Sequence, residues 1–239
     1  MKFGIYTARG DHTCQGFAAS CLHELVDAAY YASIGVDFLK DDSCSSCSGL
    51  PSDVEDDYRR MQMALDFVGG NMSLAFEGQP SIQDVYQGNF GNGRRVGHDI
   101  SPSWLSAMTL VDIGSGLWPY AHNDTGMGSF WNWLDFIQVG RGDFVPTTDP
   151  QDIGTRMART HFSLFAAMKS LLFMGNVLPE MTQPTIDLVL QGDLIAANQD
   201  LLGIQARRIQ STPPSNTSIV PDGTDGVALL AKCNDSEPQ

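Results

Sequence analysis

Two aspartates, Asp42 and Asp99, are the residues whose type and placement best suit catalysis. Asp42 ends an acidic pair that directly follows a strand-like segment at 36–40, and Asp99 lies within a second short segment at 94–100. Cleavage of a glycosidic bond needs such a pair, because one carboxylate attacks the anomeric carbon while the other protonates the leaving oxygen. The two can act together only if their strands are near neighbours in a closed or curved sheet.

Two cationic side chains precede these aspartates at spacings that could assist them. Lys40 comes two residues before Asp42, so both side chains point to the same side of a strand. Its ammonium group would keep Asp42 ionised, as a nucleophile requires. Arg95 comes four residues before Asp99 and could bind a sugar hydroxyl or the carboxylate itself. His98 is a rival acid/base, although a single histidine without a partner is more often structural.

Polar side chains recur where the predicted strands end. In a parallel barrel the carboxyl ends of the strands form the face that carries the active site. One polar residue at such a place is an ordinary loop residue, but a series at successive strand ends favours a site. The series comprises Tyr6, Arg9, Lys40, Asp42, Glu77, Arg95, Asp99, Asn132 and Asp135.

Strand-like and helix-like segments alternate from residue 2 to about residue 200. Apolar runs predict strands at 2–6, 36–40, 72–77, within 94–100, at 130–137 with a loop, and at 170–175. Helical periodicity predicts helices at 22–34, 52–68, 103–115, 155–170, 182–190 and 193–198. Ser52, with Glu55 three residues on, suits a capping box for the second of these helices. Repeated βα units imply parallel strands, so both a barrel and an open doubly wound sheet fit.

The pattern changes after about residue 205. Residues 211–215 read as a linker or loop, and 226–233 as a lone strand. We therefore expect an α/β domain over 1–205, and over 206–239 a linker with the first strands of an incomplete C-terminal β domain. No GxGxxG or P-loop motif follows a strand, which argues against nucleotide binding.

Composition excludes some classes of partner. The 239 residues carry a formal net charge of −14, and a surface this acidic repels phosphate backbones, so nucleic acid is not expected as a partner. No apolar run reaches the length of a membrane span, so no membrane partner is expected either. The oligomeric state is not predicted by any feature of the sequence.

Four of the five cysteines fall in the first 47 residues, and the fifth is Cys233. Cys44 and Cys47 have a zinc-like spacing, whereas Cys14 and Cys21 are further apart, with His12 and His23 as the nearby histidines. Two disulfides are favoured over a metal site, and disulfides would indicate an oxidising compartment.

Several segments, in order, resemble glycoside hydrolase family 27, the family of α-galactosidases and α-N-acetylgalactosaminidases. GVDFLKDDSC at 35–44 resembles its GVDYLKYDNC motif, which contains the nucleophile, and RVGHDI at 95–100 matches its arginine and acid/base aspartate at the same spacing. The resemblance runs from residue 2 to about 205. Its other segments are KFGIY at 2–6, WNWLD at 131–135, RTHFSLF at 159–165 and IAANQDLLG at 195–203.

The resemblance implies a TIM-type (β/α)8 barrel followed by a β-sandwich, and a retaining hydrolase that releases terminal α-D-galactose. Asp42 would be the nucleophile and Asp99 the general acid/base. It also implies a disulfide between Cys14 and Cys44, and beside that pair we expect Cys21 and Cys47 to form the second. No metal or organic cofactor is implied. Sugar hydroxyls would be bound by Tyr6, Lys40, Glu77, Arg95 and Asp135.

The chain also departs from the family pattern. It starts near the family's third strand, so we expect a barrel that lacks its first βα units. Phe76 stands where the family's CEW motif has a cysteine, while Glu77 is retained and favours galactose, because it leaves less room for an N-acetyl group. The expected substrate is a galactose-containing oligosaccharide or glycoconjugate, met in a secreted or lysosome/vacuole-like compartment. The alternatives are an α-N-acetylgalactosaminidase, a β-L-arabinopyranosidase, or an inactive carbohydrate-binding remnant.

Overall fold

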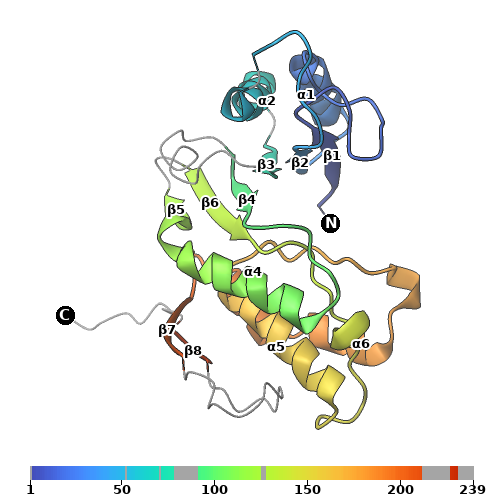
Figure 1. Ribbon diagram of the computed structural model, residues 1–239, viewed down its shortest axis with the longest axis vertical. Coiled ribbons are helices and arrows are strands. Elements are labelled where there is room, and N and C mark those ends of the chain that lie inside the picture. Colours follow the sequence, from blue (N-terminus) through green and yellow to red (C-terminus); the bar gives the residue numbers. More distant parts are fainter. Residues whose placement is uncertain are drawn as a thin grey trace, which may run out of the picture. The chain divides into compact units, whose positions relative to one another are not determined.

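The computed structural model describes residues 2–51, 53–69, 71–77, 91–124, 128–211 and 227–230 (Figure 1). The chain forms two compact units, each described here by itself. The first comprises residues 1–95 and 124–131, and the second comprises residues 96–123 and 132–239.

The first unit is built on a parallel sheet. Its strands β1 to β4 pair in chain order, each parallel to the next, and β6 and β5 follow β4 in the same sheet. The strands and helices of this unit are β1 (Gly4–Ala8), α1 (Glu24–Ser33), β2 (Phe38–Asp42), α2 (Val54–Val68), β3 (Ser73–Phe76) and β4 (Gly93–Arg95). Strands β5 (His122–Asp124) and β6 (Gly128–Trp133) each contain residues of both units. Parallel pairing of consecutive strands requires a crossover, and α1 and α2 provide the first two.

Helices α1 and α2 lie side by side against β1 to β3 (Figure 1). Their facing sides and the sheet enclose a core whose members include Ala28, Tyr31, Leu39, Met61, Leu65 and Leu74. Helix α2 starts at Val54, where Asp53 caps it by accepting the backbone N–H groups of Glu55 and Asp56 at 2.9 and 3.2 Å. The expected cap, Ser52, lies outside the described residues.

The second unit is mainly helical. It contains α4 (Trp104–Gly116), α5 (Ile153–Ala167), α6 (Gln183–Val189), α7 (Gly192–Asn198), β7 (Arg207–Ser211) and β8 (Val227–Leu230), with short 3₁₀ helices at Trp118–Tyr120, Gly142–Phe144 and Leu178–Glu180. Helices α4 and α5 pack together around a core that includes Leu110, Leu134, Phe144, Phe162 and Phe165. In the part of the chain that is described, no helix combines the length and apolarity needed to cross a bilayer.

Three elements differ from the sequence-based expectation, and one of them is β5, which lies in a stretch where the sequence predicts no strand. The predicted strand at 170–175 is reduced to one parallel bridge between Ile137 and Met174. Asp135 and Lys169 have φ angles of +74° and +57°, which interrupt the extended backbone on both partners. Strand β7 was not predicted, because its sequence RRIQS has only one apolar residue; it pairs antiparallel with β8.

The face of β2 toward the helices holds a buried acidic cluster. Asp41 is fully buried, and its two carboxylate oxygens have no hydrogen-bond partner among the described residues. Burial raises the pKa of Asp41 well above its usual range, and the charges of Glu24, Asp42 and Asp57 raise it further, while Arg9 opposes them. Asp57 pairs with Arg9 at 2.5 Å. Asp41 is therefore the uncompensated member of this cluster.

We expect Leu110→Ala to lower the free energy of unfolding by about 2–5 kcal/mol, because Leu110 is fully buried and its removal leaves a cavity in the core of the second unit. Leu105→Ala on the same helix is the matched control, since Leu105 is 77% exposed and its loss should change stability by less than about 0.5 kcal/mol. Denaturant unfolding followed by circular dichroism measures both. Equal losses would contradict the packing of α4.

We expect the stability of the protein to fall as pH rises above about 4, because Asp41 must ionise. A raised pKa in the folded state means that the stabilising effect of the neutral form is complete below the unfolded-state pKa and is lost as pH rises through the folded-state pKa. Asp41→Asn stays neutral, so the melting temperature of this variant relative to the parent should rise with pH. Asp56→Asn removes the same charge from an exposed site on α2 and should show no such trend. A pH-independent difference for Asp41→Asn would contradict the prediction.

Candidate active site

The register of the parallel sheet places five of the predicted site residues on one face. Tyr6 on β1 is the register partner of Lys40 on β2. One step further along, Asp42 ends β2 and Glu77 follows β3, whose last residue Phe76 pairs with Asp41. Arg95 ends β4, one residue beyond the pair formed by Phe76 and Arg94. Because side chains alternate between the faces of a strand, Asp42, Glu77 and Arg95 share a row beside Tyr6 and Lys40.

Asp42 is held by donors on both of its carboxylate oxygens. The Tyr6 hydroxyl donates to Oδ2 at 2.6 Å, and the backbone N–H of Ser43 donates to Oδ1 at 2.7 Å. The Lys40 ammonium lies 3.7 Å from Oδ2. Burial raises the pKa of Tyr6 above its usual range, and the hydrogen bond to Asp42 raises it further. The phenol therefore stays protonated at neutral pH and donates a hydrogen bond to Asp42.

Lys40, Glu77 and Arg95 form a chain of alternating charge beside Asp42. The Lys40 Nζ lies 2.8 Å from Glu77 Oε2, and Arg95 Nη2 forms an ion pair with Glu77 Oε1. Burial raises the pKa of Glu77, while Lys40 and Arg95 oppose that shift. The row therefore presents donors and acceptors in alternation, which suits hydroxyl groups that both donate and accept hydrogen bonds.

Two disulfides join the segment that follows β1 to the segment that follows β2. Cys14 pairs with Cys44, as the resemblance implies, and Cys21 pairs with Cys47, as expected for the second pair; the Cα–Cα distances are 4.9 and 5.4 Å. The Cys14–Cys44 bond borders the site directly, because Tyr6 Oη lies 3.2 Å from Cys44 Sγ and Cys14 Sγ lies 3.9 Å from Asp42 Oδ2. It restrains the loop that follows Asp42.

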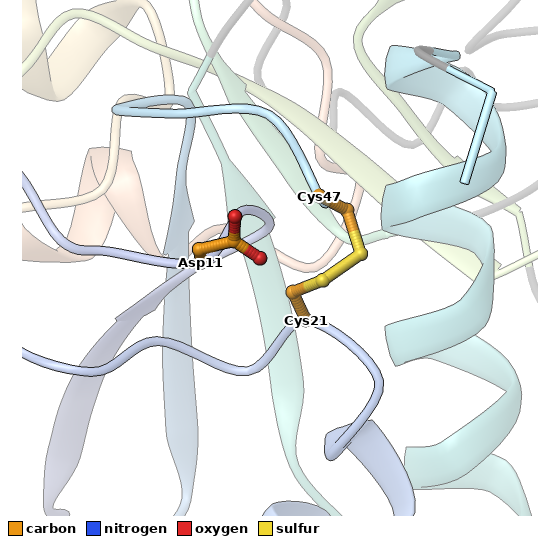
Figure 2. Close-up of side chains that lie close together, drawn as sticks. All are labelled: Asp11, Cys21 and Cys47. Atoms are coloured by element: carbon orange, nitrogen blue, oxygen red, sulfur yellow. A yellow bond between two sulfur atoms is a disulfide. The ribbon is translucent and has the colours of Figure 1, made fainter. Parts of the chain in front are cut away.

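The sulfur atoms of these four cysteines are used in disulfides rather than as metal ligands. Figure 2 shows Asp11 near the Cys21–Cys47 bond, a grouping of residue types that could hold a metal ion if the cysteines were thiolates. The Cys14, Asp42 and Cys44 group is of the same kind. A disulfide sulfur carries no negative charge, so the cysteines of these two groups offer no thiolate ligands.

Asp99 and Asp135 belong to the second unit. Asp99 is exposed, in the segment between β4 and α4. Asp135 is 4% exposed, and its carboxylate accepts the backbone N–H groups of Ile100 and Phe136, both at 2.8 Å. The structure thus brings Tyr6, Lys40, Asp42, Glu77 and Arg95 together, while the approach of Asp99 to Asp42 stays a prediction.

Sequence reasoning missed the backbone donors of this region. The Ser43 amide on Asp42 and the Ile100 amide on Asp135 carry no signal in the sequence, because every residue except proline has the same N–H group. A cavity of about 540 Å³ elsewhere in the second unit is lined by residues of α5 to α7, including Arg159, Asp187 and Gln191. None of the predicted site residues lines it.

Comparison with known proteins adds an independent line of evidence. The sequence model of the family described as "Alpha galactosidase A" matches residues 1–200. Alpha-galactosidase 3 of Arabidopsis thaliana is 32% identical over 244 aligned residues, which cover 100% of this chain and 52% of the plant protein. Alpha-galactosidase A of Cellvibrio japonicus is 34% identical, over 87% of this chain and 50% of that protein. The chain spans about half the length of these curated relatives.

Solved structures show the same relationship. The α-galactosidase of Saccharomyces cerevisiae matches with a TM-score of 0.75 and 25% identity, over 92% of this chain and 51% of that chain. Alpha-galactosidase I of Mortierella vinacea matches with a TM-score of 0.73 and 26% identity, over 89% of this chain and 56% of that chain. Together with the parallel strands and their helices, this likeness shows part of a TIM-type (β/α) barrel. The chain belongs to the alpha-galactosidase A family.

Proposed function

We propose that the protein containing this chain is a retaining α-galactosidase, in which Asp42 is the nucleophile and Asp99 the general acid/base. The observation that supports it best is the environment of Asp42. Asp42 is 7% exposed, and its carboxylate is oriented by the Tyr6 hydroxyl and the Ser43 amide and lies 3.7 Å from the Lys40 ammonium. A carboxylate held in one orientation needs less reorganisation to attack a bound sugar.

The proposed reaction proceeds in two displacements. Asp42 attacks the anomeric carbon, and the bond to the leaving oxygen breaks as Asp99 donates its proton to that oxygen. Asp99, now ionised, takes a proton from a water molecule, which attacks the anomeric carbon and releases Asp42. Two inversions at the same carbon return the sugar to its original configuration.

The charged row beside Asp42 is proposed to recognise the sugar. Lys40, Glu77 and Arg95 are each 15% exposed or less at their side chains, so their hydrogen bonds to hydroxyl groups are shielded from water. Glu77, if it lies near the 2-position, leaves less room for an N-acetyl group and favours galactose. Tyr6 completes this surface through its ring and hydroxyl, and the family resemblance adds Asp135 to it.

The proposed substrate is a galactose-containing oligosaccharide or glycoconjugate. One solved structure of the Saccharomyces cerevisiae α-galactosidase, which is 25% identical to this chain, contains raffinose. A secreted or lysosome/vacuole-like location is proposed as well, and two disulfides support it because such bonds persist in oxidising compartments. We also propose a domain boundary at residue 205, with a β domain beginning in 206–239. The antiparallel pairing of β7 with β8 supports it.

The roles of the two aspartates can be separated with p-nitrophenyl α-D-galactopyranoside and azide. Asp42→Ala should lose about four orders of magnitude in kcat/KM, because no nucleophile remains. Azide can occupy the vacated space and attack with one inversion, so the recovered product should be β-galactosyl azide. In Asp99→Ala, azide should attack the galactosyl-enzyme and give α-galactosyl azide. NMR of the product distinguishes the two anomers.

Asp56→Asn is the control for both variants, since it removes an exposed carboxylate from α2 and should retain full activity. Full activity in folded Asp42→Ala would rule out the assigned nucleophile. If the parent protein hydrolyses only the α-N-acetylgalactosaminide or only the β-L-arabinopyranoside, that sugar would replace galactose as the proposed substrate.

A further inference from the structure

Asp135 has an unusual backbone conformation. Its φ angle is +74°, and Leu22 and Lys169 are the other non-glycine residues with positive φ in the described part of the chain. Such a conformation costs on the order of 1–3 kcal/mol in most non-glycine residues, although Asp and Asn tolerate it better. Asp135 lies two residues after Trp133, where β6 ends. Strain of this kind persists where surrounding contacts over-determine it, and such places are often functional.

The carboxylate of Asp135 accepts two backbone N–H groups. Oδ1 accepts the N–H of Phe136, the next residue, and Oδ2 accepts the N–H of Ile100, both at 2.8 Å. The residue is 4% exposed, so these charge-assisted bonds are shielded from water. A buried carboxylate of this kind is stabilised only while its donors stay in place.

The Ile100 amide adjoins Asp99 directly in the chain. The segment is tied at a second point, where the N–H of Val96 donates to the Trp133 carbonyl at 3.0 Å. Both acceptors belong to the short stretch 133–135, so this stretch holds the residues on either side of 97–99. The side chain of Asp99 is exposed, and the anchored backbone on either side of it helps to set its direction.

We propose that Asp135 is a positioning residue for the acid/base Asp99, which it serves by anchoring the Ile100 amide, and that this is its main role in place of direct contact with the sugar. The role in catalysis rests on the function proposed above, because that function assigns Asp99 its task. The anchoring itself rests on the geometry of the second unit alone.

Positioning of Asp99 and direct contact with the sugar predict different dependence of the rate on the leaving group of the substrate. Proton donation by Asp99 matters for a poor leaving group and little for a strongly acidic phenol, whereas a contact to the galactose ring matters equally for all. The test compares kcat/KM, which reports formation of the galactosyl-enzyme, for 2,4-dinitrophenyl α-galactoside and methyl α-galactoside. The variant is Asp135→Asn, which tolerates positive φ but replaces one acceptor oxygen with an NH₂ group.

We expect Asp135→Asn to lose about 10- to 100-fold in kcat/KM on the methyl galactoside and less than about threefold on the dinitrophenyl galactoside. Asp99→Ala should show a larger difference between its losses in kcat/KM on the two galactosides. Asp152→Asn is the matched control, because it replaces another carboxylate that accepts a backbone N–H in the second unit, that of Thr155, and should show no dependence on the leaving group. An equal loss on both substrates with a raised KM would assign Asp135 to the sugar and overturn the proposal.

Hydrogen exchange tests the anchor without any activity. The Ile100 amide should exchange at least about tenfold faster in Asp135→Asn than in the parent and in Asp152→Asn, and an unchanged rate would overturn the proposal. Asp135→Glu, which keeps the charge but displaces the oxygens, replaces Asp135→Asn if that variant does not fold. Inactivity of the parent on the dinitrophenyl galactoside would refute the proposed function, while the exchange rate would still decide on the anchor.

Discussion

The parallel register of β1 to β4 is the constraint on which the candidate site depends. Tyr6 pairs with Lys40, and the next same-face row runs through Asp42 toward Glu77 and Arg95. A shift of one residue in any pairing would turn that strand's side chain to the opposite face, because the period of a strand is two. The ion pairs of the site therefore exist because the strands are aligned, and the core beneath α1 and α2 aligns them.

Asp41 and Asp42 are neighbours on β2, but they point to opposite faces of the strand and meet different surroundings. Asp42 meets the Tyr6 hydroxyl, the Ser43 amide and the Lys40 ammonium, whereas Asp41 is buried toward α1 and α2 without a hydrogen-bond partner among the described residues. Burial of an unpaired carboxylate favours its neutral form. Adjacent residues of one type thus acquire different chemistry solely because a strand alternates the direction of its side chains.

Phe76 shows how the packing here replaces a feature of the family pattern. It stands at the position of the family's cysteine, is fully buried, and its ring centroid lies 4.9 Å from that of Tyr58 and 6.3 Å from that of Phe130. Gly91 accommodates the ring: a Cβ atom there would lie 2.5 Å from Phe76 Cε1, and its φ is +73°. The neighbouring Glu77 keeps its ion pairs with Lys40 and Arg95 in this aromatic setting.

The sequence by itself determined the family, the helices α1, α2, α4 and α5, and the set of residues that meet around Asp42, because apolar periodicity and motif spacing are local properties of the chain. The predicted strand at 170–175 and the missed β7 show the limit of that reasoning, since pairing depends on distant partners and on the positive φ of Asp135 and Lys169. Only the tertiary structure decided that the carboxylate of Asp135 accepts the backbone N–H groups of Ile100 and Phe136. Backbone donors are chemically alike at every position, so which of them a buried carboxylate reaches is decided by the fold.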